Sequence, residues 1–327
     1  MKSILIPGGA GYIGSHTVRI LADRGYNPII FDNMSEGHRA AVKDFELIEG
    51  DLLDGGSLEK VFNTRRIDGV IHFAAFSLVG VSMTQPFRYY RNNVVGTLNL
   101  LEAMHKADVS NIVFSSTCAT YGVPDTVPIT EQEKTAPINP YGETKLAVEK
   151  MLKWSDEAYG IKSVCPRYFN AAGAMPDGSI GEDHRIETHL IPLVYRSILR
   201  CETLKVFGDD YATPDGSCIR DYIHVLDLAN AHVKALQYLQ DGGSSMPINL
   251  GTEHGASVFE IIAAAEKASG QKVEYEITSR RAGDPPSLVA DATLAREKLG
   301  WTANHSLDDI MRDAWSWHES HPNGYHD

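Results

Sequence analysis

The sequence predicts an α/β fold, with a doubly wound parallel sheet followed by a smaller C-terminal substrate-binding lobe. Three observations support this prediction. Short apolar segments alternate with segments of helical length and period over the first half of the chain, which is typical of repeated βαβ units. A glycine-rich turn joins the first apolar segment to the first helical one. After about residue 170 the alternation ends and Gly, Pro and Asp become frequent, which indicates a second architecture.

The individual elements follow from local hydrophobic period. The expected strands are residues 2–7, 27–32, 45–49, 70–74, 111–115 and 162–166. The first helix is expected at 12–25, and in the longest segment between strands Val94, Leu98 and Leu101 fall on one helical face. Strands that alternate with helices pair in parallel, because each helix carries the chain back to the same end of the sheet.

The second half of the chain divides less regularly. We expect residues 1–170 to form the dinucleotide-binding domain and residues 171–327 to form mainly the second lobe. Residues of about 225–250, helical at first and then strand-like at 248–250, are candidates to return to the first domain. An amphipathic helix is expected at 307–318.

The composition is that of an ordinary globular protein, with 43% hydrophobic and 22% charged residues in 327. A formal net charge of −13 argues against non-specific nucleic-acid binding, because phosphate backbones attract basic surfaces. No stretch approaches about 18 apolar residues and the N-terminus lacks a signal-type apolar region, so we expect no membrane segment and a cytoplasmic location. The four cysteines form no CxxC pair, which predicts free thiols and neither a disulfide nor a zinc site.

A cofactor site is predicted at the glycine-rich turn. Gly8, Gly11 and Gly14 lie between the first strand and the first helix, where a pyrophosphate needs a tight turn, close backbone approach and the helix amides. Asp32 ends the second strand, where an acid accepts hydrogen bonds from ribose hydroxyls and disfavours a 2′-phosphate; this favours NAD over NADP. Asp51 ends the third strand and either faces the adenine or is a solvated turn acid.

A catalytic centre is predicted at Tyr141 and Lys145, which lie four residues apart at the start of a helix opened by Pro140. Of the fourteen tyrosines, Tyr141 alone has a lysine four residues later. A neighbouring cation and the positive nicotinamide would stabilise the phenolate and make the tyrosine a usable base. Thr117, at the end of the fifth strand, either relays a proton and fixes the substrate or merely caps a turn.

Several longer motifs together carry a resemblance. They are Gly-Gly-Ala-Gly-Tyr-Ile-Gly-Ser-His (8–16), Phe-Ser-Ser-Thr (114–117), Pro-Tyr-Gly-Glu-Thr-Lys (140–145), Arg-Tyr-Phe-Asn (167–170), Arg-Asp-Tyr-Ile-His-Val-Leu-Asp-Leu-Ala (220–229), Arg-Arg-Ala-Gly-Asp (280–284) and His-Pro-Asn-Gly-Tyr (321–325). Over nearly its whole length the chain resembles the extended short-chain dehydrogenase/reductases, and within them the 4-epimerases of nucleotide sugars.

The resemblance implies a Rossmann-type domain, tightly held NAD, and Tyr141, Lys145 and Thr117 as catalytic residues. It implies interconversion of UDP-glucose and UDP-galactose through a transient 4-keto intermediate. The implied cofactor contacts, with the glycines and the catalytic pair, are Tyr12, Ile13, Asp32, Asn33, Asp51, Leu52, Phe73, Ala74, Asn92 and Phe169. The implied substrate contacts, with Thr117, are Asn170, His189, Leu190, Lys205, Val206, Phe207, Arg220, Arg281, Asp284 and Leu288. Two arginines suit a diphosphate, because guanidinium groups bind phosphate in a bidentate manner.

Four positions depart from the commonest family pattern. Pro7 replaces a threonine before the glycines, and Ser77 stands where some members have a lysine near the phosphates. His189 stands in place of an asparagine that often holds the nucleotide. Leu288 replaces a bulky tyrosine, which would widen the sugar pocket enough to admit an N-acetyl group.

Alternatives to glucose/galactose epimerisation remain open. UDP-N-acetylhexosamines and UDP-pentoses share the UDP group, so epimerisation of either is compatible with the same contacts. A nucleotide-sugar dehydratase is disfavoured, because Cys118 and Ala119 follow Thr117 where family dehydratases have an acidic pair. A non-catalytic NAD sensor would not need the tyrosine, lysine and threonine together. By resemblance we expect a homodimer; apolar faces near Leu98 and Leu152 could serve it, although core burial explains them equally well.

Overall fold

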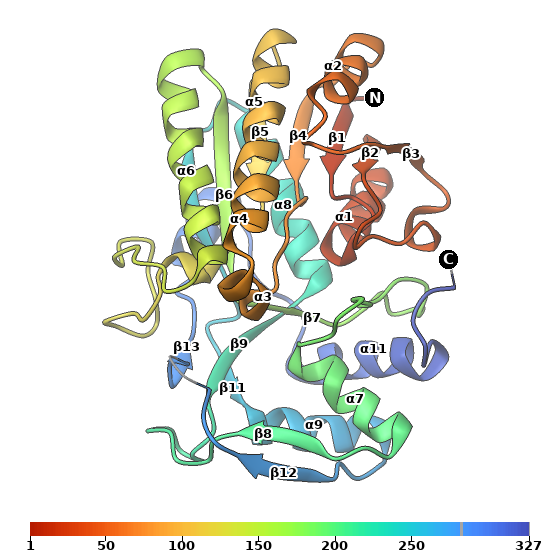
Figure 1. Cartoon of the computed structure of the whole chain (residues 1–327), viewed down its shortest axis with the longest axis vertical. Helices are drawn as coiled ribbons and strands as arrows, with labels where there is room; N and C mark the ends of the chain where they lie inside the picture. Colours follow the sequence, from red (N-terminus) through yellow and green to blue (C-terminus); the bar gives the residue numbers. More distant parts are fainter. Residues whose placement is uncertain (282–283, 327) are drawn as a thin grey trace.

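The computed structural model describes residues 1–281 and 284–326. Its first lobe contains a parallel sheet with the strand order β10-β6-β5-β4-β1-β2-β3 (Figure 1). The predicted doubly wound α/β fold is confirmed, and the strand order reverses between β1 and β4, where such sheets open a ligand crevice. The strands are β1 (Ser3–Pro7), β2 (Asn27–Asp32), β3 (Glu46–Glu49), β4 (Gly69–His72), β5 (Asn111–Phe114), β6 (Lys162–Tyr168) and β10 (Met246–Leu250).

Helices cover both faces of this sheet, because side chains alternate along each buried strand. On one face Ile4 and Ile6 pack with α1 (Tyr12–Asp23) and α8 (Val225–Gln240). On the other face Leu5 packs with α2 (Gly55–Thr64), α5 (Gly96–Lys106) and α6 (Pro140–Tyr159). The later segments α8 and β10 thus belong to the first lobe, where β10 pairs with β6.

The helix pattern around α5 differs from the sequence prediction. The segment Tyr90–Val95 is a π-helix, which changes the number of residues per turn just before α5 begins. Leu98 is 43% exposed, whereas Leu101 is buried, so these two residues do not share one buried face. Leu152 is fully buried in the core beneath α6, which rules it out as a dimer contact.

The second lobe lies below the first in Figure 1 and contains two small sheets. One holds β7 (Asn170–Ala172), β9 (Ile219–His224), β11 (Gly255–Ser257) and β13 (Ser287–Leu288). The other pairs β8 (Leu204–Phe207) with β12 (Tyr275–Thr278). A separate hydrophobic core joins them to α7 (Leu190–Arg200), α9 (Val258–Ser269) and α11 (Leu307–Ser320).

Short elements complete the chain. They are α3 (Val79–Thr84), α4 (Pro86–Tyr89), the 3-10 turns Ala40–Val42 and Cys118–Thr120, and α10 (Thr293–Leu299), which packs on α8 and β10. All four cysteines are free thiols, as predicted. Across the described ranges 1–281 and 284–326, no helix is long and apolar enough to cross a membrane.

Candidate active site

The glycine-rich turn between β1 and α1 is closely packed. Gly8 has a φ of +79°, and a Cβ there would lie 2.3 Å from the backbone nitrogen of Ala74. A Cβ on Gly14 would lie 2.3 Å from the carbonyl oxygen of Gly8. Gly11 is the N-cap residue of α1, and without a side chain it leaves the first-turn amides accessible to an anion. The turn therefore has the shape that a pyrophosphate requires.

A cavity opens beside this turn at the carboxyl ends of β1, β2 and β4. The expected cofactor residues that line it are Gly8, Gly11, Asp32, Asn33, Asp51, Leu52, Phe73, Ala74 and Asn92. Further lining residues, including Ser35, Glu36 and Gly37, come from the loop after β2, and the sequence analysis did not single them out. The cavity and the turn together fit a dinucleotide.

Asp32 is 8% exposed at the end of β2, and burial raises its pKa. One of its carboxylate oxygens accepts a hydrogen bond from the Ala10 amide at 3.0 Å and the other from the Met34 amide at 2.9 Å. Each oxygen keeps a second lone pair for a ribose hydroxyl. Asp51 accepts from Asn33 Nδ2 at 3.0 Å and from the Leu53 amide at 2.8 Å, so it also stabilises its own turn.

Three expected cofactor residues have side chains engaged within the protein. Tyr12 donates from its hydroxyl to the Gly173 carbonyl at 2.6 Å, and Ile13, also in α1, packs against the hydrophobic core. Phe169 is buried in a small apolar cluster beside Leu288. Tyr12 and Ile13 would therefore contact a cofactor through their backbone atoms. Ser77 is exposed in the loop before α3.

Tyr141 and Lys145 lie on the first turns of α6, as their spacing predicts. Asn139 caps this helix by accepting a hydrogen bond from the Gly142 amide at 2.8 Å. Tyr141 is 8% exposed and Lys145 is 3% exposed. The Lys145 ammonium donates to the Ser115 carbonyl at 2.6 Å and lies 5.9 Å from the centre of the Tyr141 ring. The helix thus joins the catalytic pair to the end of β5.

Burial dominates the electrostatics of this pair in the absence of a cofactor. Burial raises the pKa of Tyr141 well above its usual value, and a hydrogen bond from Thr117 opposes the rise. Burial also lowers the pKa of Lys145 to about 7, with nearby Glu149 acting in the opposite direction. Without the cofactor, therefore, Lys145 does not lower the pKa of Tyr141 below its usual value, because desolvation disfavours both charged forms.

Thr117 caps a turn and also makes a hydrogen bond with Tyr141. Its Oγ1 accepts a hydrogen bond from the Ala119 amide at 3.2 Å, which caps the turn Cys118–Thr120. In this contact the hydroxyl is only an acceptor, so its hydrogen remains available for donation. A side-chain hydrogen bond links Thr117 to Tyr141. The cap holds the hydroxyl in place beside the phenol.

A buried network beneath the site was missed by the sequence analysis. Glu149 lies two turns after Tyr141 on α6 and forms a buried ion pair with Arg167 of β6. Ser116 donates to Glu149 at 2.5 Å, and Arg167 donates to the Tyr121 hydroxyl at 3.0 Å. The spacing of Tyr141, Lys145 and Glu149, four residues at each step, was the available signal.

Another missed residue is Asn93, which is buried in the π-helix. Its Nδ2 donates to the Phe76 carbonyl at 3.0 Å and to Thr144 Oγ1 at 3.1 Å, and its Oδ1 accepts from the Phe76 amide at 2.9 Å. Asn93 thereby connects the loop after β4 to α6 next to Lys145. No motif in the sequence marked it.

Some of the expected substrate residues lie on or beside β9 and β13. Arg220 forms an ion pair with Asp284, and its Cα pairs in register with Leu288. Arg281 lies over the ring of Phe207, 4.1 Å from its centre. Leu288 and Cys118 both pack against the buried cluster that contains Phe169, so this part of the second lobe lies close to the turn after Thr117.

The remaining expected substrate residues are placed as follows. Lys205 is exposed, 4.0 Å from Glu276, whereas the Val206 side chain is buried in the second core and offers only its backbone to a ligand. Asn170 begins β7 and pairs with Tyr222. His189 is the N-cap residue of α7, and Leu190 begins that helix. The His189 ring contacts Glu182 and Glu187.

Comparisons with known proteins agree with this architecture. Residues 4–251 match the NAD dependent epimerase/dehydratase family. A UDP-glucose 4-epimerase of Halalkalibacterium halodurans is 53% identical, over 99% of this chain and 97% of that protein. A crystal structure of a UDP-glucose 4-epimerase covers 100% of both chains at 51% identity with a TM-score of 0.98.

A second solved structure shows what a relative binds. The Bifidobacterium longum UDP-glucose 4-epimerase, in complex with NAD+ and UDP, is 40% identical and has a TM-score of 0.94, covering 99% of this chain and 100% of that one. The family match and the full-length relatives agree with the presence of a dinucleotide cavity. The chain therefore belongs to the NAD-dependent epimerase/dehydratase family.

Proposed function

We propose that this protein is an NAD-dependent 4-epimerase of UDP-sugars that interconverts UDP-glucose and UDP-galactose. The observation that carries the proposal is the position of Tyr141, Lys145 and Thr117 at the end of β5, between the dinucleotide cavity and the Arg220 region of the second lobe. The full-length epimerase relatives support the same activity.

The second lobe supplies the anchoring of the nucleotide. Arg220 and Arg281 are guanidinium groups suited to the diphosphate of a UDP-sugar. Arg220 is balanced by Asp284 in the protein alone, so a diphosphate would compete with this carboxylate for the same donors. Tight binding of the non-reacting UDP leaves the sugar free to turn, which an inversion at C4 requires.

Within the catalytic centre each residue has a distinct role. The Tyr141 phenol oxygen, in its ionised form, accepts the proton of the sugar 4-hydroxyl, directly or through the hydroxyl of Thr117. Lys145 is held by the Ser115 carbonyl close enough to favour that ionised form when it is charged. Bound NAD supplies the hydride acceptor and, once reduced, the donor that regenerates the alcohol. Hydride returns to one face of C4 of the transient 4-keto sugar, and Tyr141 returns the proton to the oxygen on that carbon.

The alternatives differ in what they need from the turn after Thr117. Cys118 is half-buried, and burial raises the pKa of its thiol to about 12, so it offers no acid/base group at neutral pH. Ala119 offers none either. Simple epimerisation therefore fits this turn better than dehydration does.

We also propose a homodimer formed through the helices of the first lobe. Leu98 is 43% exposed on α5, and Trp154 is 64% exposed on α6. Large exposed apolar side chains on neighbouring helices are suited to a symmetric contact. The expected cytoplasmic location stays a prediction.

The test is to incubate the purified protein with UDP-galactose, without added NAD, and to separate the products by chromatography. We expect UDP-glucose to form, and Tyr141→Phe to lower kcat by about 10²–10⁴-fold because the proton acceptor is lost. Tyr159→Phe is the matched control, since Tyr159 lies at the exposed end of the same helix. If NAD is present in the preparation and no UDP-glucose appears, the proposed substrate pair is wrong.

A further inference from the structure

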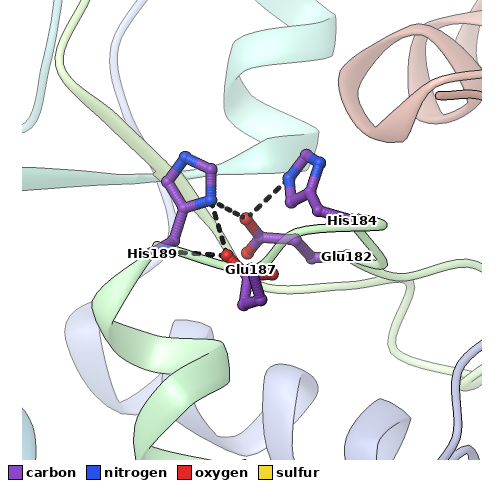
Figure 2. Close-up of side chains that lie close together, drawn as sticks. All are labelled: Glu182, His184, Glu187 and His189. Atoms are coloured by element: carbon purple, nitrogen blue, oxygen red, sulfur yellow. Dashed lines mark hydrogen bonds and ion pairs between the residues drawn. The ribbon is translucent and has the colours of Figure 1, made fainter. Parts of the chain in front are cut away.

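Four potential metal ligands converge on one loop, just before α7. Figure 2 shows the side chains of Glu182, His184, Glu187 and His189 directed toward a common point. The cysteine spacing predicts no metal site, but these ligands are imidazoles and carboxylates. We infer that the four residues form a binding site for a divalent transition-metal ion, with zinc as the preferred ion.

The distances suit a small tetrahedral ion. His184 Nε2 and His189 Nδ1 each lie 3.1 Å from Glu182 Oε1, and His189 Nδ1 lies 2.9 Å from Glu187 Oε1. All four ligand atoms lie within 4.8 Å of one another. Zinc bonds of about 2.0 Å in a tetrahedron place the ligand atoms about 3.3 Å apart. The three shortest separations need to widen by about 0.2–0.4 Å, and the widest need to contract, for an ion to bind.

Burial and charge also favour a cation here. The side chains of Glu182 and Glu187 are 5% and 8% exposed, and buried carboxylates require a compensating positive charge. The two negative charges of the carboxylates, with two neutral imidazoles, balance the two positive charges of one divalent ion. The mixture of nitrogen and oxygen donors favours zinc over magnesium or calcium, which prefer oxygen ligands alone. The competing interpretation is a network of ion pairs with protonated histidines.

The loop is held in place from both lobes. The Trp317 indole of α11 donates to the Glu182 carbonyl at 3.1 Å. Arg185 donates to the Ser35 carbonyl at 2.7 Å, in the loop that lines the dinucleotide cavity. The His184 ring lies edge-on to Tyr12, with 6.3 Å between ring centres. An ion bound here would lock the loop between α11 and the cofactor side of the first lobe.

The experiment uses the intact, cofactor-containing protein after dialysis against a chelator. Titration with zinc chloride in a calorimeter is expected to show one site per chain. Replacing zinc with Co²⁺ is expected to give the intense visible absorption of a tetrahedral site. His184→Gln and Glu187→Gln each remove one ligand and are expected to weaken zinc binding by at least about tenfold.

The matched control is His254→Gln, because His254 is exposed and lies outside the cluster. This variant should bind zinc as the unaltered protein does. Unchanged binding in His184→Gln and Glu187→Gln, or an absence of stoichiometric zinc binding, would overturn the inference in favour of the ion-pair network. If circular dichroism shows that the variants fold poorly, the Co²⁺ spectrum of the unaltered protein is the test of the inference. A weak spectrum of the octahedral type would overturn the inference. Epimerase activity enters none of these measurements.

Discussion

The ammonium of Lys145 lies 2.6 Å from the carbonyl oxygen of Ser115, and this contact joins helix α6 to the end of strand β5. Both groups are buried, so the lysine is held by a backbone dipole in an environment that otherwise disfavours its charge. The lysine is thus held 5.9 Å from the centre of the Tyr141 ring.

Lys145→Met should lower kcat by about 10²–10⁴-fold, because it removes the cation that favours the ionised form of Tyr141. We also expect less NAD to remain bound through purification. Activity on UDP-galactose and the ultraviolet absorbance of released NAD measure the two effects. Lys153→Met, at an exposed position on the same helix, is the control. Full activity in Lys145→Met would remove the lysine from the mechanism.

Thr117→Val should lower kcat and move the rising limb of the pH–kcat profile to higher pH. The reason is that the hydrogen bond from Thr117 lowers the pKa of Tyr141, and the phenolate is the active base. Thr117→Ser keeps the hydroxyl and should restore the original profile. If Thr117→Val lowers the maximum kcat but does not shift the pH profile, the hydroxyl acts only on the substrate or the turn.

Arg220→Met should raise KM for UDP-galactose by about 10–100-fold with a smaller effect on kcat, because a charge-assisted hydrogen bond to the diphosphate is lost. Steady-state kinetics and UDP binding measure this. The matched control is Arg280→Met, since Arg280 is exposed and pairs with Asp210. An equal rise in KM for both variants would indicate a general effect of charge rather than a specific diphosphate contact.

Leu288→Tyr should reduce conversion of UDP-N-acetylgalactosamine more than conversion of UDP-galactose. Leu288 packs against the same cluster as Cys118, which follows Thr117, and a larger side chain there leaves less room for the N-acetyl group. The ratio of kcat/KM for the two sugars is the measurement. An unchanged ratio would show that Leu288 does not border the C2 substituent.

Stability should fall as the pH is lowered from 7 to 5. Burial lowers the pKa of His72 to about 3 and those of His16 and His232 to about 4, whereas the unfolded chain has histidine pKa values near 6.5. Between these values the unfolded state binds more protons, so acid favours unfolding. At pH 5 the loss is on the order of 2 kcal/mol for each such histidine.

Urea unfolding at several pH values measures this dependence. His72→Gln should make the free energy of unfolding depend less steeply on pH, since it removes one of the titrating groups. His254→Gln should leave the dependence unchanged, because His254 is exposed. A pH dependence equal in His72→Gln and the unaltered protein would show that His72 is not buried in its neutral form.

The sequence by itself determined the features that depend on local pattern. Apolar strands separated by helices predict a parallel sheet, and the spacing of Gly8, Gly11 and Gly14 predicts a tight turn between the first strand and the first helix. Tyr141 and Lys145 share a helix face because four residues make about one turn. These relations need only neighbouring residues, so they could be predicted without the fold.

The tertiary structure alone decided what depends on distant neighbours. Leu152 became core and Leu98 surface because sheet packing and a π-helix set the rotation of the helices. Glu149 forms an ion pair with Arg167, and desolvation shifts the pKa of Lys145. Both effects require segments that are distant in the sequence to pack together. The convergence of Glu182 with His189 likewise depends on a loop path that no local period encodes. Burial and charge compensation are sums over all surrounding atoms, and only the folded chain supplies them.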